Sequence, residues 1–235
     1  MPNIITNRLT LHGTEQEKIN EVFTFLEGEE SEMDFNKIIP MPAELSGTEC
    51  GSRADEAWAL FQAKGLGNFE RIDEMLTWAW VKEEGIKTRE EMIEHLERNF
   101  IKNGHPQNSR FSTLYDYGKH IYGLKQKYGF CNWYEWSVAN WKVKWNAFDV
   151  SKEGNVIEFF TAWAGVPNLM LKASEMFPEV TFSYEFADEL FGYNLGRYVF
   201  RAGEVVSEYE PEDFSVEAKI LAKEILGYEE GESEE

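Results

Sequence analysis

The sequence predicts an α+β fold in which two βαβ halves of an antiparallel sheet are separated by a large all-helical insertion. Residues 1–42 show the pattern of a strand, a helix and a second strand. Residues 43–150 have apolar residues at helical spacing and no clear strand. Residues 151–227 show another βαβ pattern, followed by a hairpin and a final helix. Together these segments predict the ferredoxin-like split βαβ sheet.

The first half of the sheet is predicted from three short patterns. Alternating apolar residues predict a strand over residues 7–12. Thr14 and Glu17 have the spacing of a capping box, and apolar residues at helical spacing follow them. Residues 33–39 have the pattern of an extended strand, and the Pro-Met-Pro sequence at 40–42 forbids a helix there. We therefore expect strand, helix and strand over residues 1–42.

Five segments of the insertion have the periodicity of amphipathic helices. They are residues 54–64, 69–79, 88–100, 114–128 and a segment that starts at Asn132. The tryptophans after Asn132 would spread over half of an ideal helix. We therefore expect this last helix to end near Asn140, or some of the tryptophans to stay exposed.

The second half is predicted from alternation, helical spacing and turn residues. Strands are expected at residues 156–163 and 180–186 and in a hairpin at 192–201 and 204–209; helices are expected at 167–177 and 218–225. Residues 228–235 include five glutamates and predict a disordered tail.

The composition narrows the class of protein. The chain has a net charge of −20, which would repel nucleic acid and excludes broad DNA binding. The charge favours partners with a basic surface, or it serves solubility alone. The sequence contains no apolar run of membrane-spanning length and no signal peptide, so we expect a soluble cytoplasmic protein. Cys50 and Cys131 lack metal-ligand spacing, and we expect both to be reduced thiols.

One segment reverses the charge of the chain. Residues 98–152 hold nine lysines and arginines against three acids, a local net charge of +6. The same segment contains a cluster of tryptophans and lysines that could stack on bases, form a protein interface or line a pocket. These candidate binding residues are Trp133, Trp136, Trp141, Lys142, Lys144 and Trp145. The alternative is that they pack the insertion against the sheet.

The sequence contains no recognisable catalytic constellation. His12, His95, His105 and His120 do not form a metal-binding motif. His120 is the best candidate among them, because Asp116 lies four residues earlier on the same helix face and could orient the imidazole. Asp188 and Glu189 are adjacent carboxylates. The glycines of the segment 64–68 could offer amides to a phosphate, but the segment lacks a phosphate-binding motif and does not follow a strand, so a turn between helices is the preferred explanation. We therefore expect a non-enzymatic protein with no metal ion and no cofactor.

Several motifs resemble those of the YubB-like family of phage and plasmid proteins. They extend from residue 1 to about residue 205 and comprise Met1-Pro-Asn3, Asn7–Thr10, Asp34–Pro42, Tyr128–Trp136, Asn140-Trp141, Lys144–Ala147, Phe160–Trp163 and Phe177-Pro178. The resemblance implies a ferredoxin-like domain but no established activity. One position departs from the family pattern, because Lys142 stands where the family usually has glycine. Glycine would suit a left-handed helix end, a conformation that is unfavourable for lysine.

Two functions follow as expectations. The first is a non-enzymatic accessory protein of a phage or mobile element that acts in the bacterial cytoplasm. It would bind a host macromolecule, such as a host protein with a basic surface, and could inhibit a defence system. The alternative is a small-molecule or nucleotide-binding module whose pocket lies between the sheet and the insertion, at the tryptophans and lysines named above. Direct binding of RNA or single-stranded DNA is a third expectation. The sequence gives no indication of the oligomeric state.

Overall fold

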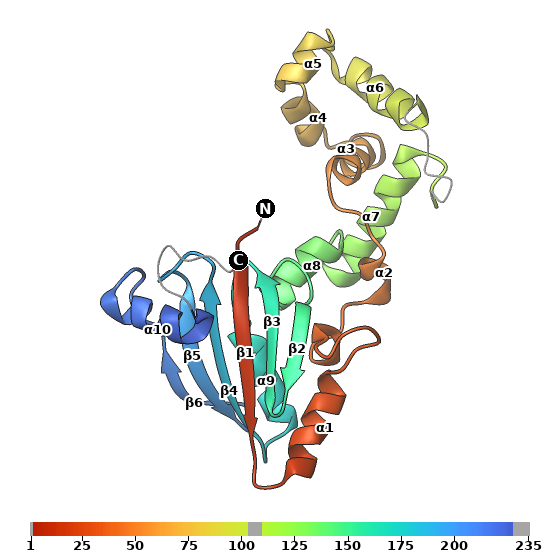
Figure 1. Cartoon of the computed structure of the whole chain (residues 1–235). Coiled ribbons are helices and arrows are strands. Elements are labelled where there is room, and N and C mark those ends of the chain that lie inside the picture. The colour runs from red at the N-terminus through yellow and green to blue at the C-terminus, as the bar shows by residue number, and fades with distance from the viewer. Residues whose placement is uncertain (1, 103–109, 228–235) are drawn as a thin grey trace. The chain divides into compact units, whose positions relative to one another are not determined.

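The computed structural model describes residues 2–102 and 110–227 (Figure 1). The chain divides into two compact units. The sheet unit comprises the residues up to Met41 and those from Ser137 onward, and the helical unit comprises Pro42–Trp136. The predicted acidic tail, residues 228–235, lies outside the described residues.

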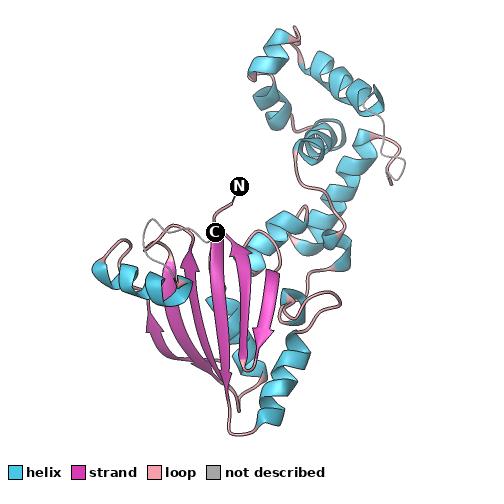
Figure 2. Cartoon of the chain, in the orientation of Figure 1, coloured by secondary structure: helices cyan, strands magenta, loops and turns pink. Residues whose placement is uncertain are grey.

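The sheet unit is built on six antiparallel strands (Figure 2). They are β1 (Ile4–His12), β2 (Phe148–Glu153), β3 (Val156–Ala162), β4 (Thr181–Asp188), β5 (Leu195–Arg201) and β6 (Glu204–Tyr209). Their order in the sheet is β2-β3-β1-β4-β5-β6. The first four positions of this order follow the ferredoxin-like pattern, and β5 and β6 extend it. The predicted α+β fold is therefore confirmed.

The prediction of a strand at residues 33–39 is wrong. This segment contains a short 3-10 helix, η1 (Phe35–Lys37), because the Asp34 carboxylate accepts a hydrogen bond of 2.9 Å from the Asn36 backbone amide. The second strand of the ferredoxin-like pattern is β2, which follows the helical unit in the sequence. The insertion was expected to extend to residue 150, but residues from Ser137 onward belong to the sheet unit.

Helices lie on both faces of the sheet. They are α1 (Gln16–Leu26), α9 (Pro167–Met176) and α10 (Val216–Leu226). The capping box expected from Thr14 and Glu17 is absent from α1, whose N-cap is Glu15 with no side-chain hydrogen bond. Figure 1 shows α9 behind the sheet and α10 in front of it. Aromatic rings of Phe25 and Phe177, 5.3 Å apart, join α1 to the end of α9.

A buried polar network fixes the register on the α9 face. The Tyr184 hydroxyl donates to Asn7 Oδ1 at 2.6 Å, and the Asn7 amide donates to Thr161 Oγ1 at 2.9 Å. The Val166 backbone amide donates to the same tyrosine oxygen at 2.6 Å, at the start of α9. Burial raises the pKa of Tyr184 well above its usual range. The network therefore joins three strands and one helix through satisfied polar groups.

The opposite face carries a ladder of ion pairs. Arg8 on β1 lies between Glu158 (2.6 Å) and Glu185 (2.9 Å) on the neighbouring strands. Arg197 on β5 continues the ladder to Glu185 and to Glu224 of α10, at 2.9 Å each. Arg8 also donates to the Ile225 carbonyl at 3.2 Å. These contacts hold the last turn of α10 against the sheet.

The helical unit contains most of the remaining helices. They are α2 (Ala43–Ser46), α3 (Ser52–Leu66), α4 (Glu70–Met75), α5 (Ala79–Glu83), α6 (Arg89–Lys102) and α7 (Leu114–Tyr128), while α8 (Trp133–Asn140) contains the boundary between the units. The helix predicted over 69–79 is broken in two. The ends predicted for α7 and the end of α8 near Asn140 agree with the structure.

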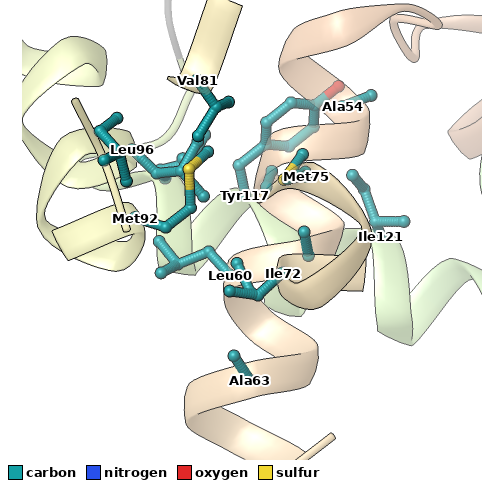
Figure 3. Packing of buried hydrophobic residues seen from close by; sticks show 14 residues of the cluster. Ala54, Leu60, Ala63, Ile72, Met75, Val81, Met92, Leu96, Tyr117 and Ile121 are labelled. Atoms are coloured by element: carbon teal, nitrogen blue, oxygen red, sulfur yellow. The ribbon is translucent and has the colours of Figure 1, made fainter. Parts of the chain in front are cut away.

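The core of the helical unit forms around α3 and α7 (Figure 3). Figure 3 shows Leu60 of α3 close to Ile72 of α4 and Met92 of α6, with Tyr117 of α7 beside Met75. Gly118 permits the close approach of α3 and α7, because a Cβ there would lie 2.1 Å from the Ala57 carbonyl oxygen. The unit therefore has a hydrophobic core of its own.

Candidate interaction surface

Helix α10 has apolar residues on its exposed side as well as on its buried side. Ala218, Leu221 and Ile225 are buried against the sheet. Val216 and Ile220, one turn apart, are 70% and 56% exposed. A surface helix normally presents polar residues on its outer face. The outer face of α10 is therefore a candidate contact surface.

The chain before α10 enlarges this apolar surface. Phe214 is 54% exposed, and its ring stacks on Tyr193 with centroids 5.6 Å apart. The Phe214 amide donates to the Gly192 carbonyl at 2.6 Å, which holds the turn at residues 190–193 beside the start of the helix. We call Tyr193, Phe214, Val216 and Ile220 the α10 patch.

The backbone at Phe214 is strained. Its φ of 60° lies in the left-handed region, which costs a residue with a side chain about 1–3 kcal/mol. An exposed phenylalanine in an unfavourable conformation does not contribute to the core. Backbone strain of this kind is often found at functional sites.

The chain that leads into α10 is rich in acidic residues. The segment 204–217 contains six acids and no lysine or arginine. Asp213 accepts a hydrogen bond of 3.0 Å from the Asn194 amide, and Glu210 accepts one from the Tyr198 hydroxyl. Burial raises the pKa of Tyr198 above its usual range, and the charges of Glu210 and Glu208 raise it further. We call Glu212, Asp213 and Glu217 the acidic rim of the patch, and Lys219, whose side chain lies beside Gly192, adds one positive charge there.

The candidate residues predicted from the sequence divide between the two units. Trp133 and Trp136 belong to the helical unit, and Trp136 is buried. Trp141 belongs to the sheet unit, where its Nε1 donates to the Ile39 carbonyl at 3.0 Å and its ring meets Phe35 edge-on at 5.8 Å. Trp141 therefore packs the segment after α8 onto η1, which is a structural role.

The two lysines predicted as binding residues, Lys142 and Lys144, have different environments. Lys142 is exposed with φ 67°, the left-handed conformation expected from the glycine of the family pattern, and its Nζ donates to the Ala139 carbonyl at 2.8 Å. Lys144 Nζ lies 4.6 Å from the ring centre of Trp145 and 5.7 Å from that of Trp163. The structure thus brings Lys144 and Trp145 together with Trp163, a residue that the sequence reasoning did not include.

Most of the residues considered in the sequence for catalysis or phosphate binding have structural roles. Asp116 caps α7 with Thr113, whose hydroxyl donates to it at 2.8 Å, and within the described residues no hydrogen bond joins it to His120. Asp188 is buried among amide donors while Glu189 is exposed. Asn68 accepts a hydrogen bond of 3.0 Å from the Glu70 amide, as in a turn between helices. His105 lies outside the described residues.

Metal and thiol chemistry receive no support from the described part of the chain. Among the described residues, no group of three or more histidine, cysteine, aspartate or glutamate side chains is placed so that it could hold a metal ion. Burial raises the pKa of Cys131 to about 11, and the neighbouring Glu135 adds to this shift. The thiol is therefore protonated at neutral pH and is a poor nucleophile.

Comparison with known proteins identifies the class of the C-terminal part. Residues 140–233 match the family model described as the ferredoxin-like domain in Api92-like protein. A crystal structure of the protein api92 from Yersinia pseudotuberculosis is similar to this chain, with a TM-score of 0.42 and 12% identity over 92% of this chain and 100% of that one. A comparison with curated proteins gives no match. The description of the matched family names Api92. It does not mention YubB, phages or plasmids.

Among residues 2–102 and 110–227, none of the helices combines the length and the apolar character needed to cross a membrane.

The sequence reasoning missed the α10 patch. It identified the buried stripe of the last helix but gave no weight to Phe214, Val216 and Ile220. A signal was present in the sequence, because this helix has apolar residues on two faces and follows a run of acids.

Proposed function

We propose that this chain is a non-enzymatic accessory protein that binds a protein with a basic surface through the α10 patch. The observation that carries the proposal is the exposure of Phe214, Val216 and Ile220 inside an acidic rim. Interfaces commonly combine an apolar centre, which contributes most of the affinity, with a charged rim. The partner should therefore present an apolar pocket surrounded by lysines and arginines.

The charge of the whole chain supports the same kind of partner. A net charge of −20 attracts a basic protein over a distance set by the ionic strength. Such attraction accelerates association and weakens when salt is added. Removal of rim charges should therefore change the association rate, whereas removal of apolar side chains should change the dissociation rate.

The setting of this function is part of the proposal. The resemblance to YubB-like proteins supports an origin in a phage or another mobile element and action in the bacterial cytoplasm. An acidic protein can imitate the charge of nucleic acid toward a host protein that binds it. Inhibition of a host defence protein is therefore the proposed consequence of binding.

Affinity capture from a nuclease-treated bacterial lysate tests the proposal. The wild-type chain is compared with a triple variant, Phe214→Ser/Val216→Ser/Ile220→Ser. The matched control, Leu66→Ser/Met176→Ser/Val206→Ser, removes three other exposed apolar residues of 47–63% exposure. Circular dichroism confirms that both variants fold.

We expect a basic protein to be captured by the wild type and the control and to be lost with the triple variant. Its recovery should also decrease in high salt and with the rim variant Glu212→Lys/Glu217→Lys. A partner that binds all four proteins equally would overturn the proposal. So would recovery of a partner only when nuclease is omitted, because nucleic acid would then be the bound species.

A further inference from the structure

The helical unit contains a hollow that is separate from the α10 patch and from the predicted tryptophans and lysines. It has a volume of about 280 Å³, at the lower end of the range for small-ligand pockets. Its lining includes Arg53 of α3, Phe100 of α6, and Tyr117 and His120 of α7. Arg110 and Phe111, which precede α7, also line it, and the rest of the wall is Glu44, Gly47, Thr48 and Glu49. All of these residues belong to one compact unit.

The wall contains one notable buried polar group, the Tyr117 hydroxyl. Tyr117 is 6% exposed, and its hydroxyl forms no hydrogen bond of normal geometry with the described residues; the Glu49 backbone amide is near enough only to lower its pKa slightly. An unsatisfied buried hydroxyl is unfavourable, and such groups are uncommon in folded proteins. Burial raises the pKa of Tyr117 to about 12, so the hydroxyl keeps its proton and can donate it in a hydrogen bond to an incoming acceptor.

Two arginines of the wall, Arg53 and Arg110, are available to bind an anion. Neither Arg53 nor Arg110 lies within ion-pair distance of a carboxylate among the described residues. By contrast, the wall residue Glu44 pairs with Lys127 at 2.7 Å, so one of the nearby negative charges is already compensated. Glu49 is the second carboxylate of the wall and is exposed. Arginine is suited to bidentate binding of phosphate and carboxylate groups.

Aromatic side chains form another part of the wall. Phe111 stacks on Tyr117 with ring centroids 5.0 Å apart, and His120 contacts Phe111 at the same distance. Burial and the charge of Arg110 lower the pKa of His120, so this ring is mainly uncharged at neutral pH. The wall thus combines apolar faces with donors, and this combination is typical of sites for organic anions.

We infer that the hollow binds a small organic anion, with its phosphate or carboxylate held by Arg53, Arg110 and the Tyr117 hydroxyl and its apolar body against Phe100 and Phe111. The two arginines of the wall balance its two carboxylates, Glu44 and Glu49, and Glu44 is already paired with Lys127. The site is independent of the proposed binding to a basic protein.

Isothermal titration of the full chain with defined probes tests the inference. The probes are the nucleoside 5′-monophosphates, ribose 5-phosphate, benzoate and inorganic phosphate. We expect at least one organic anion to bind at millimolar concentration or below and more tightly than inorganic phosphate. The inference is overturned if none of the probes binds, or if inorganic phosphate binds as tightly as every organic probe.

Variants then assign the binding to the hollow. Arg53→Gln and Arg110→Gln should each weaken binding by about tenfold or more, because each removes a charge-assisted hydrogen bond. Tyr117→Phe should weaken it by a smaller factor. The matched control is Lys119→Gln, which removes one positive charge from an exposed site on α7, outside the described wall. Unchanged affinity in a folded Arg53→Gln/Arg110→Gln double variant would show that the anion binds elsewhere and would refute the assignment.

Discussion

Two glycines of α7 allow a paired test of the packing between α3 and α7. A Cβ at position 118 would lie 2.1 Å from the Ala57 carbonyl oxygen and 2.6 Å from Phe61 Cβ. At position 123 a Cβ would have nothing within 4 Å. Gly118→Ala and Gly123→Ala are therefore the same chemical change in the same helix, with and without a steric clash.

The expected magnitudes follow from this geometry. Each substitution gains about 0.8–1 kcal/mol of helix propensity, because glycine is unfavourable inside a helix. Gly123→Ala should therefore raise the free energy of unfolding of the helical unit by about 1 kcal/mol. In Gly118→Ala the two helices must separate by more than an ångström, and overpacking of this kind typically costs about 1–3 kcal/mol. The propensity gain cancels between the variants, so Gly118→Ala should be less stable than Gly123→Ala by about 1–3 kcal/mol.

Urea denaturation followed by tryptophan fluorescence measures these differences. Hydrogen exchange of the amides of Ile121 and Leu124 shows whether the change is located in α7. We expect faster exchange in Gly118→Ala and slower exchange in Gly123→Ala than in the wild type. Equal midpoints and equal exchange in the two variants would refute the close approach of α3 and α7 on which the described core depends.

Three further predictions concern single residues. Lys142→Gly should stabilise the sheet unit by about 1 kcal/mol, because glycine adopts the observed φ of 67° without strain, and thermal denaturation checks this. Tyr117→Phe should raise the free energy of unfolding of the unliganded chain by about 1 kcal/mol, because an unsatisfied buried hydroxyl is removed, and loss of stability in urea denaturation would contradict this. The folded-state pKa of His120 is lowered, so its contribution to stability is present above its ordinary pKa of 6.5 and is lost as the pH falls from there through the folded-state pKa. Stability curves of the wild type and His120→Gln should therefore diverge below pH 6.5, and parallel curves would show that His120 is not perturbed.

The regular elements could be predicted where local pattern and local chemistry agree. The helix α7 begins after Thr113, which caps it, and ends at Gly129 in the left-handed conformation, so both of its ends are set by adjacent residues. The start of α6 could be predicted for the same reason, because Thr88 and Glu91 form a capping box: the Glu91 amide donates to Thr88 Oγ1 at 3.2 Å, and the Thr88 amide donates to the Glu91 carboxylate at 3.1 Å. Such signals need no knowledge of distant contacts.

The second strand could not be located in this way. Residues 33–39 have the composition of a strand, but Asp34 Oδ1 accepts a hydrogen bond of 2.7 Å from Asn146, a residue beyond the helical unit. This long-range contact stabilises η1 and leaves the strand position to β2. Only two of the six residues of β2 are half-buried, so its sequence alternates too weakly to be recognised.

The candidate site was predicted with less success than the fold. Tryptophan and lysine content directed attention to residues 133–145, whereas Trp141 packs onto Phe35 and Lys142 ends a helix. Which aromatic side chains face the solvent depends on tertiary packing, and composition does not reveal it. The α10 patch consists of fewer aromatic residues, and it became evident only from the exposure of Phe214, Val216 and Ile220.

The central claim is that the α10 patch binds a basic protein, and hydrogen exchange of the complex tests it most directly. Exchange is measured in the free chain and in the chain bound to the captured partner. We predict that binding slows exchange at residues 190–194 and 214–221 and leaves β2 unchanged. Protection confined to other segments, with exchange at residues 190–194 and 214–221 as fast as in the free chain, would contradict the claim.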